Sequence, residues 1–263
     1  MKKLIISAFI VLMTTAGMSQ KDPMLSKPIH EIGFGLALVN PQMRDAIVSP
    51  LKWDGFGGGL DFTYARIGLK GIHEIAMRNS FGPISNRYGH EGLNAEVSLA
   101  YAYMKRINGT ELGGKLQLGS MIDWSYNFQL YESWDDSHLY WINAYELGPV
   151  VRWSNILGNN HQIALNFNLP LLALVSRPPK NKYIDQDRLP KTLLSQPHEN
   201  MKLTSIHQYI SFRLRAEYTV QLSRKTSFGI SYLLNYKSFS KPERIVMLTN
   251  TLQVCLKFKI GNL

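Results

Sequence analysis

Hydrophobic and polar residues alternate with a period of two along most of the chain, and the alternation persists over long stretches. In residues 112–130 the even positions are mostly large and apolar, while the odd positions are mostly small or polar. Residues 209–222 repeat the pattern and place Arg213, Arg215 and Glu217 on the polar face. This alternation predicts β-strands that have one apolar and one polar face.

The length of the alternating segments distinguishes a transmembrane β-barrel from a β-sandwich, because both architectures share this pattern. Further segments cover residues 93–103, 139–153, 163–173 and 246–260. Including these, the strands run to about 12 to 20 residues, whereas strands of soluble proteins usually have about five or six. A tilted strand that crosses a bilayer needs about 9 to 11 residues. The lengths therefore favour a closed antiparallel transmembrane β-barrel over a β-sandwich.

Short and long connections alternate along the chain, as expected when one end of a barrel has tight turns and the other has long loops. The short connections are residues 108–109, 154–160 and 223–226, and the longer ones are residues 41–56, 81–92, 132–138, 177–204 and 238–244. An undivided strand at residues 57–77 gives nine strands, whereas a break near Lys70 and Gly71 gives ten, which places both chain termini on the periplasmic side and every long loop on the outer side. Ten is the preferred count, with eight and twelve as alternatives.

The first twenty residues have the pattern of a secretory signal peptide. Lys2 and Lys3 precede an apolar segment at residues 4–13, and the small residues Gly17 and Ser19 follow. A basic start, a short apolar segment and small residues are typical of export signals. We therefore expect residues 1–19 to be cleaved and residues 20–263 to form the barrel domain.

Composition narrows the class of protein further. Of the 263 residues, 45% are hydrophobic and 18% are charged, and no apolar run reaches the roughly 18 residues of a spanning helix. A helical membrane protein is therefore excluded. The single cysteine, Cys255, cannot form an internal disulfide, and no cysteine cluster is available for a metal. We expect neither a cofactor nor a metal site.

The export signal, the long alternating strands and the alternating connections together resemble the small outer-membrane β-barrel proteins of Gram-negative bacteria. The resemblance covers nearly the whole mature chain, but it rests on architecture and not on a specific motif. It implies an all-β protein in the outer membrane, in contact with lipid and lipopolysaccharide, with a narrow, porin-like interior.

Charged residues on the predicted inner faces form a candidate lumen network, because unpaired charges there would be costly. Its members are Glu96, Lys115, Glu146, Arg152, Arg213, Arg215, Glu217 and Lys257. Asp61, Asp123 and Lys259 share the inward parity, which gives six basic and five acidic residues. The near balance predicts internal salt bridges that plug the lumen, and the alternative is a narrow diffusion channel.

The predicted outer loops carry excess positive charge. The candidates for contact with lipopolysaccharide phosphates are Arg177, Lys180, Lys182, Arg188 and Lys191, and the segment from Lys237 to Arg244 is a second basic loop. Formally the chain carries a net charge of +10. Nucleic acid is a common partner of basic proteins, but export and barrel topology argue against it. An envelope protein remains a possible partner.

The function that these features predict is non-enzymatic, with extracellular loops that bind an envelope or surface partner. A narrow diffusion channel is one alternative. A hydrolase at the rim of the barrel is another, because Asp135, Asp136 and His138 occur together in a predicted outer loop. Carboxylates and an imidazole can activate a water molecule if they converge on it. No catalytic residue is assigned.

Overall fold

The structure, a computed structural model, describes residues 28–68, 70–107, 114–131, 138–158, 160–178, 196–199 and 201–260. Most of these residues lie in thirteen strands of a single sheet. The first seven strands are β1 (Ile29–Asp45), β2 (Ser49–Gly55), β3 (Gly57–Ile67), β4 (Ile72–Asn86), β5 (Glu91–Ile107), β6 (Lys115–Tyr131) and β7 (His138–Leu157). The other six are β8 (His161–Asn168), β9 (Leu172–Ser176), β10 (Lys202–Ser205), β11 (Tyr209–Gln221), β12 (Thr226–Phe239) and β13 (Ile245–Ile260).

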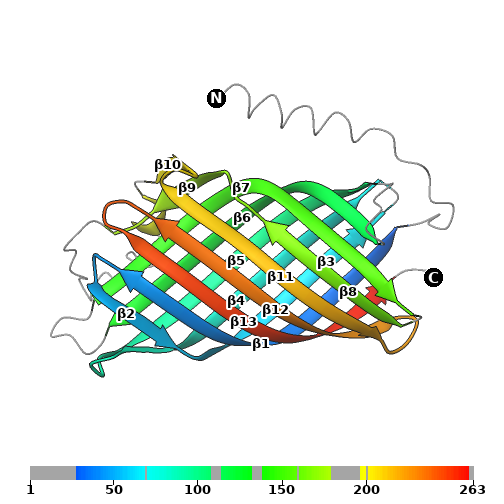
Figure 1. The fold of residues 1–263 in the computed structure, drawn as a ribbon, viewed down its shortest axis with the longest axis horizontal. Helices are drawn as coiled ribbons and strands as arrows, with labels where there is room; N and C mark the ends of the chain where they lie inside the picture. Colours follow the sequence, from blue (N-terminus) through cyan, green and yellow to red (C-terminus); the bar gives the residue numbers. More distant parts are fainter. Residues whose placement is uncertain are drawn as a thin grey trace.

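The sheet closes on itself as an antiparallel barrel, because β1 pairs with β13 along almost its whole length, from His30 opposite Ile260 to Asp45 opposite Ile245 (Figure 1). Ten strands form the ring and three more lie outside it. This confirms the predicted fold and the count of ten. The break falls where it was predicted, since β3 ends at Ile67, β4 begins at Ile72, and the Gly68 N–H donates to the Gly71 carbonyl oxygen.

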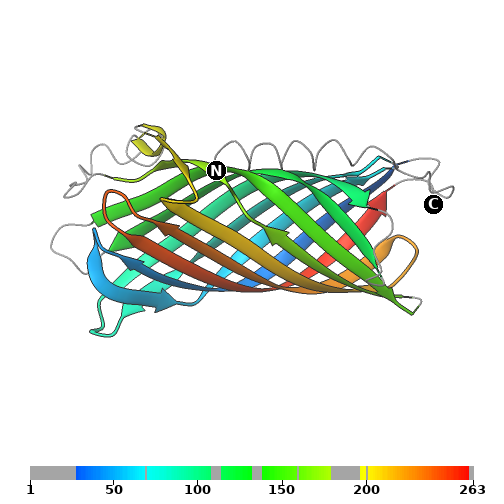
Figure 2. The same ribbon diagram turned by 45° about the horizontal axis from the view of Figure 1, so that its top comes forward.

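The two ends of the barrel differ. β1 begins and β13 ends at the end on the right of Figure 1, here called the terminal end, which also holds the tight turn between β11 and β12. The opposite end, here called the loop end, holds β2, β9 and β10. Figure 2 shows all the ring strands strongly tilted to the long axis, so each strand shifts around the wall as it crosses the barrel.

The apolar faces of the strands point away from the enclosed lumen. Leu36 on β1 and Val254 on β13 expose 63% and 42% of their surface. In contrast, Gln253 on β13 and Arg213 on β11 point to the inner face and are buried. The predicted orientation is therefore correct. An isolated barrel with this exterior presents a broad apolar band that water does not favour.

No helix within the described ranges is long and apolar enough to cross a membrane. The one short helix described is the 3-10 turn η3 (Gln196–His198) at the loop end. It lies against the outer face of β7, where the Asn143 side-chain amide donates to the Pro197 carbonyl oxygen at 2.9 Å. The predicted signal peptide, residues 1–19, lies outside the described residues.

Candidate functional site in the barrel lumen

The most deeply buried ionic cluster lies on the inner faces of β6, β7 and β11. Arg213 on β11 donates a charge-assisted hydrogen bond to Asp123 on β6. Its guanidinium also lies 3.6 Å from a carboxylate oxygen of Glu146 on β7. The Tyr209 hydroxyl donates to Glu146 in turn. Because the side chains of Asp123 and Glu146 have no exposed surface, the single guanidinium compensates two carboxylates that water does not reach.

A second buried ion pair crosses the lumen from β12 to β5. The Lys237 ammonium donates to Glu96 at 2.8 Å and to the Ser125 hydroxyl at 3.0 Å. The prediction that Lys237 begins an outer loop is wrong, because β12 continues to Phe239. Adjacent side chains of a strand point to opposite faces, so Tyr236 points outward and Lys237 points into the lumen. The Lys237 side chain is only 3% exposed there.

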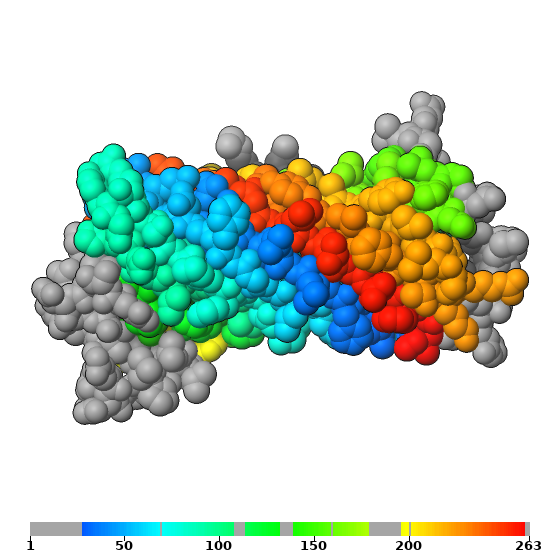
Figure 3. Space-filling view, turned by 90° about the horizontal axis from the view of Figure 1, so that it is seen from below, coloured from blue at the N-terminus to red at the C-terminus, as the bar shows by residue number. Residues whose placement is uncertain are grey.

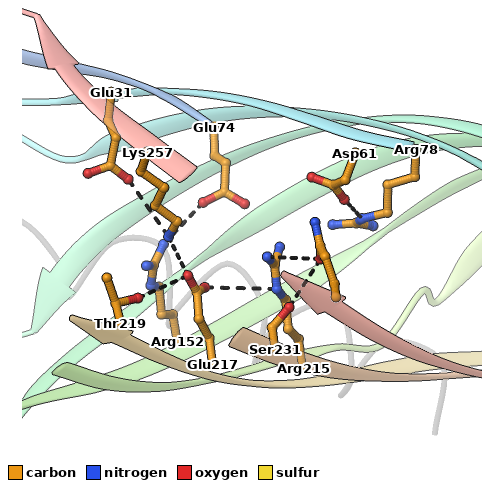
Figure 4. Close-up of polar contacts among 11 residues, drawn as sticks. Glu31, Asp61, Glu74, Arg78, Arg152, Arg215, Glu217, Thr219, Ser231 and Lys257 are labelled. Atoms are coloured by element: carbon orange, nitrogen blue, oxygen red, sulfur yellow. Dashed lines mark hydrogen bonds and ion pairs between the residues drawn. The ribbon is translucent and has the colours of Figure 1, made fainter. Parts of the chain in front are cut away.

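Closer to the terminal end, the ion pairs form a connected chain (Figure 4). Glu217 on β11 accepts from Lys257 on β13 and lies 3.8 Å from the Arg215 guanidinium. Lys257 also lies 3.8 Å from Glu31 on β1. Arg152 on β7 donates to Glu74 on β4 at 3.1 Å, in a separate pair. The connected chain thus joins three strands, and the separate pair joins two more.

The middle of the lumen is completed by one further ion pair and an amide. Arg78 donates to Asp61 at 3.0 Å across the β3–β4 pair. The Gln253 side-chain oxygen accepts from both Arg215 and the Ser231 hydroxyl, at 3.3 and 3.1 Å. Figure 4 shows Asp61 and Arg78 directed into the barrel from one wall, and Arg215 and Ser231 from the opposite wall. Their polar atoms therefore fill the space that an open pore would need.

The structure brings seven of the eight predicted network residues into ion pairs and leaves one out. Lys115 is exposed at the terminal end, and no ion pair joins its ammonium to an acid within the described ranges. Partners that were not predicted complete the network, namely Glu31, Glu74, Arg78 and Lys237. Strand parity could have identified Lys237 and Glu31, but the weak alternation at residues 57–78 concealed Glu74 and Arg78.

Apolar side chains close the loop end of the lumen. A cluster here called the aromatic plug consists of Met43, Trp53, Ile84, Tyr131, Tyr140, Ile142, Ala144, Ala173, Val175, Tyr209, Phe239, Ile245 and Met247. Trp53 and Tyr131, at its centre, have no exposed surface and their ring centroids lie 4.6 Å apart. Inward aromatic rings of this size pack as a core and leave little free volume.

Arg177 joins three separate parts of the chain beside the aromatic plug. Its guanidinium donates to both carboxylate oxygens of Asp45 at 2.6 Å and to the Glu243 carbonyl oxygen at 2.6 Å. The Arg177 side chain is only 1% exposed. The guanidinium is therefore buried in the protein and does not form the predicted contact with lipopolysaccharide phosphates.

Cavity volumes show how far the lumen is filled. In the middle, the two cavities beside Arg78 and Arg213 have volumes of about 50 and 40 Å³. A larger cavity of about 310 Å³, here called the vestibule, lies at the terminal end and is lined by Lys115, Lys257 and Lys259 among other residues. The vestibule stops at the chain of ion pairs, because Arg215 and Glu217 also line it.

The remaining predicted site residues lie beyond what the structure describes. Lys180, Lys182, Arg188 and Lys191 fall in a range outside the described residues, as do Asp135 and Asp136 and the side chain of His138. Within the described ranges, no group of three His, Cys, Asp or Glu side chains is arranged to hold a metal ion.

Comparisons with known proteins identify the fold. No family model matches the chain, and no curated protein matches its sequence. Among solved structures, the outer membrane protease OmpT from Escherichia coli matches with a TM-score of 0.51 and 8% identity, over 93% of this chain and 100% of that chain. The translocator domain of the autotransporter NalP from Neisseria meningitidis matches with a TM-score of 0.43 and 7% identity, over 98% and 96% of the two chains. The resemblance to small outer-membrane β-barrels is confirmed for the fold.

Proposed function

We propose that this chain is an exported, non-enzymatic outer-membrane β-barrel with a sealed lumen, whose loop end binds an envelope or surface partner. The observation that carries the proposal is the filling of the lumen by ion pairs in its middle and by the aromatic plug at the loop end. The apolar exterior supports a location in lipid. The closure of the sheet supports it as well, because a closed sheet satisfies every backbone amide inside a bilayer.

Two physical arguments favour a sealed barrel over a diffusion channel. A permeating ion needs a continuous hydrated path, and the mid-lumen cavities have volumes of only about 50 and 40 Å³, against about 310 Å³ for the vestibule. The charges that could select an ion are already paired with one another, as in Arg213 with Asp123 and Lys237 with Glu96. Opening a path would separate buried ion pairs, which costs several kcal/mol for each pair broken.

Planar-bilayer recording separates the sealed barrel from the channel. The barrel is inserted from detergent, and insertion is verified by resistance to protease and by heat-dependent migration in gels. The proposal predicts no unit conductance above that of the lipid alone. Stable, reproducible conductance steps in samples with verified insertion would refute the sealed lumen and favour the narrow channel.

We further propose that the loop end contacts lipopolysaccharide phosphates. Exposed cations within the described ranges of this end support the proposal, and these are Arg44, Lys52, Arg87, Lys202, Lys241 and Arg244. The predicted contacts Lys180, Lys182, Arg188 and Lys191 add to them in sequence. Lysine and arginine bind phosphate oxygens through charge-assisted hydrogen bonds.

Retention of lipopolysaccharide by the purified barrel tests this contact. The variant K180Q/K182Q/R188Q/K191Q removes the four predicted contacts, and K70Q/R224Q/K225Q removes three cations at the terminal end as a control. The first variant should retain less lipopolysaccharide than the unmodified barrel, and the control should retain the same amount. Equal retention by all three proteins would refute the predicted loop contacts.

A further inference from the structure

A row of polar residues crosses the outer face of four neighbouring strands near the terminal end. His30 on β1 lies opposite Arg66 on β3, Arg66 lies opposite His73 on β4, and His73 lies opposite Tyr103 on β5. These four residues, here called the histidine row, share the outward parity of the apolar residues farther along their strands. Side chains directly opposite one another on antiparallel strands lie about 5 Å apart. The row therefore forms one continuous patch.

Tyrosines one step farther from the terminal end hold both histidine rings in place. The Nδ1 atom of His30 is hydrogen-bonded to the Tyr64 hydroxyl at 2.7 Å, and the Nδ1 atom of His73 to the Tyr101 hydroxyl at 2.8 Å. The ring centroids of the two pairs are 5.9 and 6.2 Å apart, with similar interplanar angles of 31° and 34°. With Nδ1 occupied, the Nε2 atom of each ring remains to bind a ligand.

Arg66 supplies a full positive charge between the two histidines. Its side chain is exposed, and it forms no ion pair with any residue that the structure describes. Lys105 lies two residues beyond Tyr103 on β5, with the same outward parity. The acids near this end, Glu31 and Glu74, face the lumen and are paired there. The described part of this outer patch therefore carries cations without outward-facing acids.

The same His–Tyr pair occurs a third time without the arginine. His161 on β8 is hydrogen-bonded through Nδ1 to the Tyr218 hydroxyl on β11 at 2.7 Å. The residues opposite His161 are Val220 on β11 and Leu157 on β7. The repeated geometry suits the interface of a membrane, where rings with one polar and one apolar side are favoured. The cation at Arg66 distinguishes the histidine row from this third pair.

An apolar groove lies on the same strands, farther from the terminal end than the histidine row. Its volume is about 580 Å³, and its lining includes Phe34, Leu36, Phe62, Met77, Val254 and Phe258. The groove lies on the face seen in Figure 3, where β13 (red), β1 (blue) and β3 and β4 (light blue to cyan) run side by side. Gly35 contributes no side chain to the wall beneath it.

The spacing of the row and the groove matches the two parts of a phospholipid. Phe34 is four residues from His30 along β1, which corresponds to about 13 Å at about 3.3 Å per residue. A phosphate at the histidine row therefore leaves the upper part of an acyl chain beside Phe34 and Phe62. The groove is apolar enough for an acyl chain, and the row provides a guanidinium and two imidazoles for the phosphate.

We propose that the histidine row and the apolar groove together form a binding site for one phospholipid, recognised by its phosphate. The site rests on the proposed location in the outer membrane, and it adds a specific lipid to that location. Arg66 binds the phosphate oxygens, His30 and His73 add hydrogen bonds through Nε2, and the groove holds an acyl chain. The site faces the leaflet that surrounds the terminal end.

Native mass spectrometry of the folded barrel with palmitoyl-oleoyl phosphatidylglycerol in mixed micelles tests the site. R66Q should lower the affinity for the first bound lipid roughly tenfold, the effect of losing a charge-assisted hydrogen bond. R224Q removes an exposed cation of the turn between β11 and β12, outside the histidine row, and should leave the affinity unchanged. H30F/H73F should lower the affinity, whereas H161F, in the pair without an arginine, should not.

Filling the groove tests the acyl-chain half independently of charge. V254W places a bulky ring in the groove, and L165W adds the same ring at an exposed apolar position of β8 outside it. V254W should lower the affinity and L165W should not. Millimolar inorganic phosphate should fail to displace the lipid, and diacylglycerol should bind more weakly than phosphatidylglycerol, because the site requires the phosphate and the chain together.

Three results would overturn the site. These are unchanged affinity in both R66Q and V254W, equal losses in R66Q and R224Q, and displacement of the lipid by inorganic phosphate alone. Heat-dependent migration of each variant verifies that it is folded. Insertion of the unmodified barrel into vesicles of the same lipid is measured in parallel. Insertion without a specific first lipid refutes only the site, whereas failure to insert refutes the membrane location as well.

Discussion

Replacing Arg213 by methionine should strongly destabilise the barrel, because it leaves two buried carboxylates without a counter-charge. The Arg213 side chain is 4% exposed and contacts Asp123 and Glu146, neither of which has exposed surface. Methionine keeps much of the length of arginine and removes the charge. Breaking a buried ion pair by removing one partner typically costs about 3–5 kcal/mol. We expect R213M to lose a free energy of unfolding in this range.

Equilibrium unfolding in urea, followed by tryptophan fluorescence of the barrel in detergent micelles, measures the loss. K52M is the matched control, because Lys52 forms an exposed ion pair with Asp54 at 3.4 Å. Exposed pairs of this kind contribute about 0–1 kcal/mol. The double variant R213M/D123N removes one of the stranded charges, so it should regain part of the stability lost in R213M.

Two outcomes would contradict stranded charge as the cause of the instability of R213M. If R213M unfolds at the same urea concentration as K52M, the carboxylates of Asp123 and Glu146 must be reached by water. The lumen would then be hydrated at its centre, and the ion pairs would not seal it. A further loss of stability in R213M/D123N would likewise contradict the explanation by stranded charge.

Three further predictions concern the other closures of the lumen. K237M should destabilise the barrel in the same urea assay because it strands Glu96, and K237M/E96Q should recover part of the loss; additive losses would contradict the pair. R177M should lower the temperature at which the barrel loses its anomalous gel migration, because Asp45 becomes an unpaired buried charge; an unchanged temperature would show that the contact is dispensable. W53A should cost about 3–5 kcal/mol through the cavity it creates, yet remain non-conducting in planar bilayers, because the ion pairs still block the lumen; conductance steps would contradict closure by successive layers.

Strand parity predicted which charged residues enter the lumen but could not predict their partners. The alternation on β11 is regular, so Arg213, Arg215 and Glu217 were assigned to the inner face from sequence alone. Their partners come from strands elsewhere in the ring, and Asp123 is 90 residues from Arg213 in the chain. Such pairs depend on the stagger of the strands around the barrel, which a pattern of period two does not specify.

The aromatic plug was missed in part because four of its residues, Met43, Trp53, Ile84 and Phe239, lie where the sequence predicted loops. Pro41 lacks an amide hydrogen, which argues against a strand, yet β1 continues through it to Asp45. β2 then begins at Ser49 and carries Trp53 on its inner face. The strands extend beyond the length that a bilayer requires, and burial of the inward aromatic rings stabilises this extension. Period alone could not indicate a core at the end of a barrel.

The histidine row on the outer face was also not predicted from the sequence. Tyr64 and Tyr101 are ordinary interfacial aromatics in sequence, and His30 and His73 have no motif around them. Only the register of β1, β3 and β4 places the two histidines on either side of Arg66. A patch formed by single residues of separate strands leaves no local signal in the sequence.

The single cysteine offers the most direct test of the sealed lumen. Cys255 lies on the inner face of β13 and is 5% exposed, so the unmodified protein carries one reporter in the lumen wall. The barrel is inserted into lipid vesicles and treated with a large, water-soluble maleimide, and labelling is measured by mass spectrometry. A sealed lumen predicts no labelling until the barrel is unfolded. Rapid labelling of the folded, inserted barrel would contradict the sealed lumen.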